Sequence, residues 1–384
     1  MPARPPLLTA RFILVVTAGL AYFIAIGMML PVLPLYTKEE LGAGDVGVGI
    51  VVGSLFVGAV LVRPLAGRIG DRFGRRLLII GGALTIAASI AAYGVVENLA
   101  FIVVLRLVGG VGEAAFFVGA ATMITDLAPV ERRGEALSYW SVSIYGGLAI
   151  GPALGEGLLG DDRYTLVWLV AGAFGFFAAA LGLFTREVPR EPGAPSTQLV
   201  NRAALMPGAV LFLGLAGLAA FTAFLRLYVR EIGLGGAEGL FLLYGGLVLV
   251  VRIAGARLPD VLGARRAGTA ALVGAAAGMV VMAAWPSVVG LVIGTALFAA
   301  GMSLLYPALL VLALSRAPDS ERASVVGTFS SFFDLSQGVG ALVLGGIAEL
   351  SGYRGAFFAA GMFAIVALFV LRGRVRHPVA AQPT

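Results

Sequence analysis

The feature that most constrains this chain is a succession of apolar runs, each about 20 residues long and separated by short polar turns. A membrane-spanning helix needs about 20 mostly apolar residues. The hydrophobic fraction is 59% and the charged fraction only 12% over 384 residues, far from the averages of soluble proteins. The sequence therefore predicts an all-α integral membrane protein that leaves no room for a soluble domain.

Hydropathy and turn residues predict twelve transmembrane helices in two bundles of six. The longest polar stretch, Thr185 to Met206, holds three prolines and several charges, so it is interpreted as a cytoplasmic linker. The predicted domains are a first bundle over 1–184, the linker over 185–206, and a second bundle over 207–384 with a short cytoplasmic tail. The predicted spans are 12–36, 46–66, 77–96, 99–124, 135–159, 165–184, 207–229, 238–256, 267–285, 287–313, 324–349 and 355–371.

Basic residues are distributed unequally between the two sides of these spans. With the N-terminus inside, 21 of the 27 Lys and Arg residues, Arg63 among them, fall on inner segments and 4 fall outside. Cytoplasmic loops carry an excess of Lys and Arg, so both termini are predicted to be cytoplasmic in a plasma or inner membrane. The net charge of +6 is attributed to this bias and not to nucleic-acid binding, because the basic residues form no continuous patch.

A dense charged turn, residues 67–76 with the sequence GRIGDRFGRR, separates the second and third predicted spans. Its pattern Gly-x-x-x-Asp-Arg-x-Gly-Arg-Arg closely resembles the signature loop of the major facilitator superfamily of transporters. The resemblance implies a conformational gate that closes the cytoplasmic side against the opposite half. The gate residues are Gly67, Asp71, Arg72, Gly74 and Arg75. The simpler interpretation is that the arginines only anchor the inner face.

An internal repeat recurs at an offset of 189 residues, with Arg63 matching Arg252 and Gly151 matching Gly340. Parallel repeats of six spans are how this superfamily builds two pseudo-symmetric halves, with the substrate held between them near the midplane. Further pairs at the same offset are Asp71 and Asp260, Gly74 and Gly263, Arg133 and Arg322, and Tyr164 and Tyr353.

Arg106 and Glu113 lie seven positions apart in the fourth predicted span and therefore share a helical face. Charges in a membrane are costly, so both should face the bundle interior or a wet cavity. The segment resembles the superfamily's fourth-span motif, Arg-x-x-x-Gly-x-Gly, which is associated with proton transfer; Glu113 departs from it. The predicted role of Glu113 is proton coupling, with Arg106 moderating its charge. The alternative is a structural ion pair between helices.

Asp334 is the second candidate for proton coupling. It follows Arg322 by twelve positions, which is about 18 Å along a helix and near the middle of the bilayer. A carboxylate at that depth marks a functional site by default. Arg226 is a candidate counter-charge. The alternative role of Asp334 is that of a hydrogen-bonded packing residue.

The fifth predicted span carries Gly147, Gly151, Pro152 and Gly155, which match an antiporter-linked motif of the same superfamily. The small residues would allow tight packing on the other half, and Pro152 would bend the helix. Glu156 stands where the motif has glycine and is interpreted as reaching water at the outer end.

A group of mostly aromatic residues inside the spans is proposed to line the substrate cavity, although each is commonly a packing residue. These residues are Tyr22, Tyr145, Thr222, Arg226, Tyr244 and Tyr306. We expect no catalytic residue, metal site or cofactor, because the chain has no cysteine and a single histidine and no phosphate-binding loop.

The resemblance and these residues together predict a secondary active transporter that works by alternating access. Its predicted activity is proton-coupled efflux of small amphipathic molecules or drugs. The expected partners are a small-molecule substrate, protons and the lipid bilayer, with the protein as a monomer and no nucleic acid. One alternative is a sugar or metabolite uniporter or symporter. Another, from a different class, is a non-pumping membrane sensor or lipid-handling protein.

Overall fold

The computed structural model describes most of the chain, and that part is helical, without strands. The described ranges are 7–129, 132–160, 162–187, 200–254, 262–318 and 321–374. The centre of the predicted linker, residues 255–261 with Asp260, and the predicted tail after Arg374 lie outside them.

Six long helices and a short 3₁₀ turn make up the first half of the chain. They are α1 (Ala10–Glu39), α2 (Asp45–Phe73), α3 (Arg75–Ala92), η1 (Tyr93–Val95), α4 (Leu99–Leu127), α5 (Arg133–Leu159) and α6 (Tyr164–Phe184). Such helices suit a bilayer because each satisfies its own backbone hydrogen bonds. Side chains cap exposed ends where the chain provides them: Thr9 accepts from Phe12 N, and Asn98 accepts from Ala100 N.

The second half repeats this arrangement less regularly. Its helices are α7 (Arg202–Gly214), α8 (Ala216–Glu231), α9 (Glu238–Ala254), α11 (Ala264–Ala284), α12 (Val288–Leu314) and α13 (Arg322–Arg374). Together α7 and α8 cover the predicted seventh span, with a break at Leu215. The backbone of α13 leaves the helical conformation at Gly352, where φ is 73°.

Ten segments of the described chain are long and apolar enough to cross a membrane. One of them, Ser324–Gly373, contains both of the last two predicted spans, which meet at Gly352. The 17-residue helix α9 is not among the ten. The all-helical membrane fold is therefore confirmed, while the number of twelve crossings stays a prediction.

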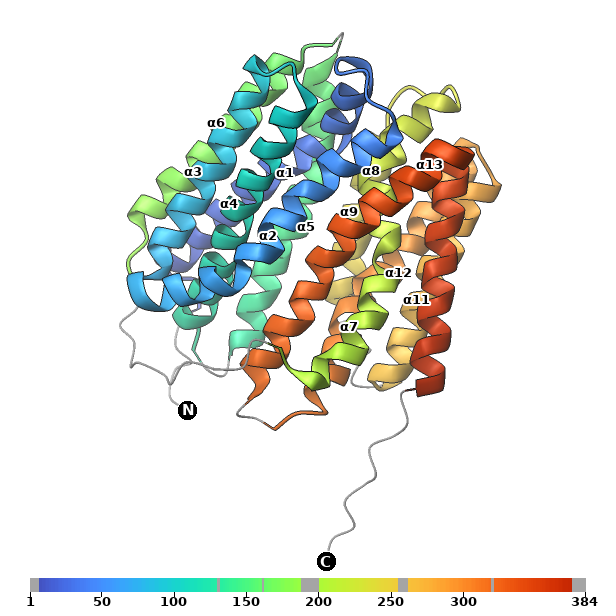
Figure 1. The fold of residues 1–384 in the computed structure, drawn as a ribbon. Coiled ribbons are helices and arrows are strands. Elements are labelled where there is room, and N and C mark those ends of the chain that lie inside the picture. The colour runs from blue at the N-terminus through green and yellow to red at the C-terminus, as the bar shows by residue number, and fades with distance from the viewer. Residues whose placement is uncertain are drawn as a thin grey trace, which may run out of the picture.

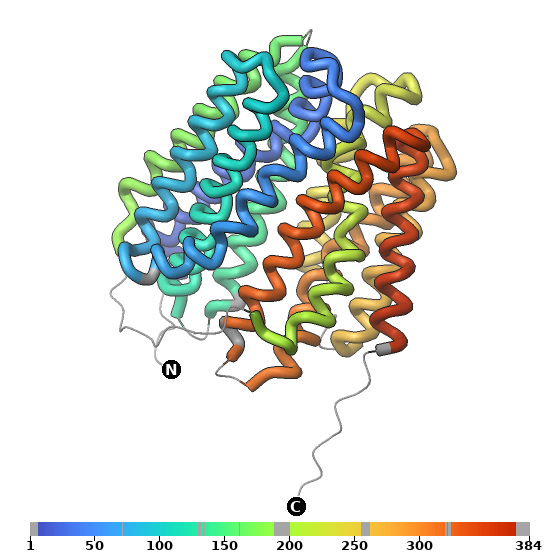
Figure 2. Tube along the Cα trace, viewed as in Figure 1, coloured from blue at the N-terminus to red at the C-terminus, as the bar shows by residue number. Residues whose placement is uncertain are grey.

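The two halves lie side by side, with α1–α6 in blue to green and α7–α13 in yellow to red (Figure 1). Helices α2 and α13 run along each other between the halves, as the tube view shows (Figure 2). Three further pairs of helices also contact each other across the halves: α5 with α9, α1 with α8 and, less extensively, α2 with α8. The start of α1, the turn at Gly74 and the end of α13 lie at one end of the bundle. We call this the basic end and the other the opposite end.

Candidate functional site

One arginine bridges both carboxylates that were predicted to couple protons. Nη2 of Arg63 lies 2.9 Å from Oε2 of Glu113 and 3.0 Å from Oδ1 of Asp334. Nε of Arg63 lies 2.6 Å from Oδ2 of Asp334, so the guanidinium holds Asp334 through two of its nitrogens. Arg63 and Glu113 belong to the first half and Asp334 to the second, so this ion cluster links the halves.

Glycine contacts allow the three helices to approach closely enough for these ion pairs. A Cβ atom on Gly110 of α4 would meet the backbone of α2 at Gly58, and one on Gly53 of α2 would meet the backbone of α13 at Gly338. Small residues permit such close helix packing in membranes. Asp334 therefore enters the interface between α2 and α13 at the level of Arg63.

The cluster is shielded from solvent. The exposed fractions of the side chains are 12% for Arg63, 10% for Glu113 and 2% for Asp334. The Arg63 guanidinium also lies over the ring of Phe117, 5.0 Å from its centroid. One cation faces two carboxylates, so the cluster has a net charge of −1 when all three groups are ionised, and a single proton would neutralise it.

Arg63 is the member of this ion cluster that the sequence analysis missed. It was counted with the inner-face arginines, although it lies within the predicted span 46–66, three residues before its end. A cation inside an apolar span faces a protein interior or a wet cavity by default. The position of Arg63 within the span therefore distinguishes it from the arginines of the 67–76 turn.

Arg106 does not pair with Glu113, although the two share a helix. Its Nε donates to the carbonyl of Val51 at 3.0 Å and its Nη2 to the carbonyl of Val52 at 3.2 Å. The guanidinium thus ties α4 to the backbone of α2, while Glu113 is bound by Arg63. The expected moderation of Glu113 by Arg106 is replaced in this structure by direct contact with Arg63.

Arg226 and Glu156 form a separate ion pair nearer the opposite end. Nε of Arg226 lies 3.2 Å from Oε1 of Glu156, and the Glu156 side chain is only 7% exposed. Glu156 also accepts from Ala237 N at 3.0 Å. Two expectations are corrected: Glu156 does not reach water freely, and Arg226 is not the counter-charge of Asp334.

The predicted cavity residues do not gather on one surface. Tyr22 is fully buried and stacks on Phe116 with ring centroids 3.8 Å apart. Tyr244 packs against Phe298 within the second half, and the Thr222 hydroxyl donates to the carbonyl of Leu218 in its own helix.

Tyr145 and Tyr306 contact different elements. Arg252 of α9 covers the ring of Tyr145 of α5. The Tyr306 hydroxyl shares a hydrogen bond of 2.8 Å with the Ser330 hydroxyl.

The gate residues separate into distinct environments. Gly74 has a φ of 96° and forms the turn between α2 and α3, whereas Gly67 has open space where a Cβ would lie. Arg75 pairs with Asp126 of α4 at 3.0 Å, inside the first half. Arg72 lies over the ring of Phe73. The side chain of Asp71 lies outside the described parts of the structure, so its place in a lock stays a prediction.

The fifth-span glycines pack on their own half. Cβ atoms on Gly147, Gly151 and Gly155 would each meet the backbone of α1. The expectation that they pack on the other half is therefore corrected. The close contact of α5 across the interface is made by Ala149, against Gly245 of α9.

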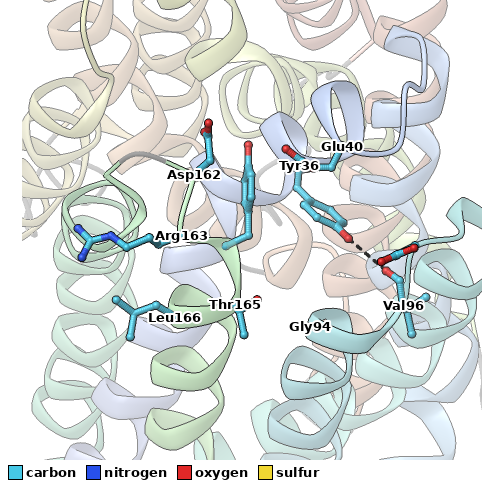
Figure 3. A pocket seen from close by; sticks show the side chains of 10 residues that line it. Tyr36, Glu40, Gly94, Val96, Asp162, Arg163, Thr165 and Leu166 are labelled. Atoms are coloured by element: carbon cyan, nitrogen blue, oxygen red, sulfur yellow. Dashed lines mark hydrogen bonds between the residues drawn. The ribbon is translucent and has the colours of Figure 1, made fainter.

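A cavity of about 430 Å³ opens at the opposite end of the first half. Tyr36, Glu40, Asp162 and Arg163 are among the residues that line it, and the Tyr36 hydroxyl donates to the carbonyl of Val96 (Figure 3). It contains none of the predicted site residues. Within the described residues, no three His, Asp or Glu side chains gather as ligands for a metal ion.

Comparisons with known proteins identify the family of this chain. A sequence profile of the Major Facilitator Superfamily matches residues 15–290 and 244–384. An uncharacterized MFS-type transporter of Salmonella typhimurium is 31% identical over 92% of this chain and 94% of its own length. Multidrug resistance protein 1 of Bacillus subtilis is 31% identical over 58% of this chain and 55% of its own length.

Solved structures show the same fold. The human organic anion transporter MFSD10 has a TM-score of 0.74 at 20% identity, covering 96% of this chain and 100% of that one. The nucleoside transporter NupG has a TM-score of 0.76 at 14% identity, covering 96% of this chain and 100% of that one. The helical membrane fold, the repeat and the matching profile lead to one conclusion: this chain belongs to the major facilitator superfamily of transporters.

Proposed function

We propose that this transporter exports small amphipathic molecules in exchange for protons, by alternating access. The observation that carries the proposal is the shared guanidinium of Arg63, which binds Glu113 within the first half and Asp334 across the interface. The coupling site therefore consists of one cation and two carboxylates at the junction of the two halves.

The charge of this cluster gives a proton a mechanical effect. Protonation of Asp334 would remove the ionic part of its attraction to Arg63, and with it the ion pair that joins α2 to α13. Protonation of Glu113 would instead leave Arg63 and Asp334 as a neutral pair and strengthen the link across the interface. A proton shifts the equilibrium between two conformations only if its affinity for them differs. Asp334 meets this condition because its ion pair with Arg63 crosses the interface, whereas the pair of Glu113 with Arg63 lies within the first half.

Polar contacts across the interface suggest which state is present. At the opposite end, Arg230 pairs with Glu39 and Arg226 with Glu156, each across the halves. We infer a state that is closed at the opposite end, with substrate entering from the basic end.

The charge bias places the basic end in the cytoplasm, so a substrate that enters there would leave the cell. We accordingly propose a multi-pass inner-membrane protein with both termini cytoplasmic, acting as a monomer. The likeness to Multidrug resistance protein 1 of Bacillus subtilis and the antiporter-type glycines of α5 support export.

The test uses purified protein in liposomes that contain a pH-sensitive dye. A panel of amphipathic drugs and small metabolites is added in turn, and the wild-type protein should move protons opposite to at least one compound. Glu113→Gln and Asp334→Asn should each reduce that proton flux at least about tenfold, because each removes a site that can lose and gain the proton.

Exposed Glu231 of α8 supplies the matched control. Glu231→Gln removes a carboxylate outside the cluster and should leave the flux unchanged. Gel filtration would verify that each variant is folded. Transport of a compound by the wild type without proton movement, or normal coupling in both cluster variants, would contradict the proposal.

A further inference from the structure

The internal repeat gives Arg63 a counterpart in the second half, Arg252, and the charges of the residues that correspond to each other in the two repeats differ. Arg252 of α9 follows Arg63 by 189 residues. At the same offset, Asp334 corresponds to Tyr145 and Glu113 corresponds to Met302. Both carboxylates that contact the first arginine thus correspond in sequence to uncharged residues of the other repeat.

The structure places Tyr145 beside Arg252, as it places Asp334 beside Arg63. Arg63 reaches across the interface to Asp334 of the other half. Arg252 likewise reaches across the interface, where its guanidinium lies 4.8 Å from the ring centroid of Tyr145. Its Nη1 also lies 3.4 Å from the Ser141 hydroxyl oxygen, which is a long hydrogen bond. The two sites are pseudo-symmetric in position and unlike in charge.

Arg252 has no carboxylate within ion-pair distance among the residues that the structure describes. It is partly buried between α5 and α9. A guanidinium is always charged and presents a planar set of donors that matches the oxygens of a carboxylate, sulfonate or phosphate. An aromatic ring stabilises the cation without accepting hydrogen bonds from those in-plane donors, so apart from the long bond to Ser141 they are available to an anion.

We propose that Arg252 is a substrate-binding residue and that the substrates are amphipathic organic anions. The anionic group would bind the guanidinium of Arg252 and the Ser141 hydroxyl, and an aromatic body would contact Tyr145 and Tyr306. This inference rests on the proposed export function and narrows its substrate class. The two repeats then have different roles. The cluster of Arg63 and its two carboxylates binds and releases protons, and Arg252, which has no such carboxylates, binds the anion.

Equilibrium binding to purified protein tests the substrate class directly. The probes are naphthalene derivatives that carry a carboxylate, a sulfonate or a phosphate, each paired with an uncharged amide, sulfonamide or alcohol of the same shape. At least one anionic probe should raise the thermal unfolding midpoint of the wild type, and its uncharged partner should not. Stabilisation of this kind reports binding to the folded state.

Variants then assign the binding to Arg252. Arg252→Gln should weaken the anionic probe about 10- to 100-fold, as expected for the loss of a charge-assisted hydrogen-bond pair. Arg252→Lys keeps the charge without the planar donors and should be intermediate. Arg202→Gln removes an exposed cation at the basic end, outside this interface, and should bind like the wild type. All variants are compared after gel filtration and with their own unfolding midpoints as the reference.

An anionic lipid headgroup offers the same chemistry as an anionic substrate, so the lipid is varied. In phosphatidylcholine nanodiscs the probe should bind, and added phosphatidylglycerol should leave its affinity unchanged. Competition by phosphatidylglycerol that Arg252→Gln abolishes would assign the arginine to lipid and overturn the proposal. Equal binding of the charged and uncharged probes would also overturn the proposal, as would the failure of every anionic probe to bind.

Failure of this inference can be told apart from failure of proton coupling, because binding is measured without a pH gradient. Anion binding through Arg252 with no proton movement during transport would remove the coupling proposal and leave this one standing. Proton-coupled transport restricted to uncharged compounds would remove the proposal of anion binding by Arg252 and leave the coupling proposal standing.

Discussion

Ion pairs join the two halves in the Arg63 cluster, at the centre of the interface, and in the Arg230–Glu39 pair, at the opposite end. The two groups differ in the exposure of their side chains and in the number of carboxylates that each arginine binds. At the centre, Arg63 is 12% exposed and serves two carboxylates. At the opposite end, Arg230 is 54% exposed and pairs with Glu39, which is 30% exposed. Each exposed partner keeps access to water, whereas the central groups depend on one another for their solvation.

This difference in burial decides what each region can do. Exposed ion pairs contribute about 0–1 kcal/mol, because water solvates the separated charges nearly as well. Removing one partner of a buried ion pair costs about 3–5 kcal/mol, because the other charge stays behind without compensation. The Arg230–Glu39 pair can therefore break and form readily, while the Arg63 cluster responds strongly to any change in its own charge.

The largest expected effect comes from removing the central cation. Arg63→Gln leaves Glu113 and Asp334 near each other without a counter-charge and should lower the free energy of unfolding by about 3–5 kcal/mol. Denaturation in increasing proportions of a harsh detergent measures it. The double variant Arg63→Gln/Asp334→Asn should be more stable than the single one, because one stranded charge is gone. Equal stability of Arg63→Gln and the wild type would show that the buried cation does not stabilise the fold more than an exposed ion pair does.

An intermediate effect is expected for the Arg226 and Glu156 pair, whose side chains are 14% and 7% exposed. Glu156→Gln keeps an acceptor for Ala237 N but removes the charge, and Arg226 retains its bond to the carbonyl of Gly235. We expect the free energy of unfolding to fall by about 1–3 kcal/mol, measured by the same denaturation. A loss as large as that of Arg63→Gln would show that the number of charges left without a partner does not rank these sites.

Much of the fold could be predicted from the sequence, because hydrophobic length and the charges at helix ends are local properties. Glu113 and Asp334 were found for the same reason: a carboxylate within an apolar run is conspicuous. Their common partner was not found, because Arg63 lies 50 and 271 positions away from them in sequence. Helical spacing predicts which residues share a face but not which neighbouring helix supplies a counter-charge.

Two further expectations failed for a related physical reason. Arg106 and Glu113 share a face of α4, yet a long guanidinium reaches the carbonyls of α2, which lies close because of Gly110. The glycines of α5 predict close packing correctly but not its partner: Gly151 faces α1 of the same half. A small-residue pattern specifies that a neighbour is near and leaves its identity to the tertiary fold.

The smallest expected effect tests the exposed pair at the opposite end. Glu39→Gln removes the partner of Arg230 and should change the free energy of unfolding by no more than about 1 kcal/mol. The same small change acts on the balance between closed and open states, so the open population at this end should rise by up to about fivefold. Spin labels at Glu97→Cys, between η1 and α4, and at Glu231→Cys, at the end of α8, both exposed positions, would report it by pulsed EPR.

The chain has no native cysteine, so only the two introduced positions carry a label in that experiment. Glu135→Gln provides the control, since Glu135 pairs with Arg132 at the start of α5 within one half and should leave the distance distribution unchanged. A rise in the open population without loss of stability would identify the exposed pair as a reversible latch. An unchanged distribution would mean that closure at this end depends on the packing of α1 with α8 and on the buried Glu156 pair, and that the exposed charges contribute only to solubility.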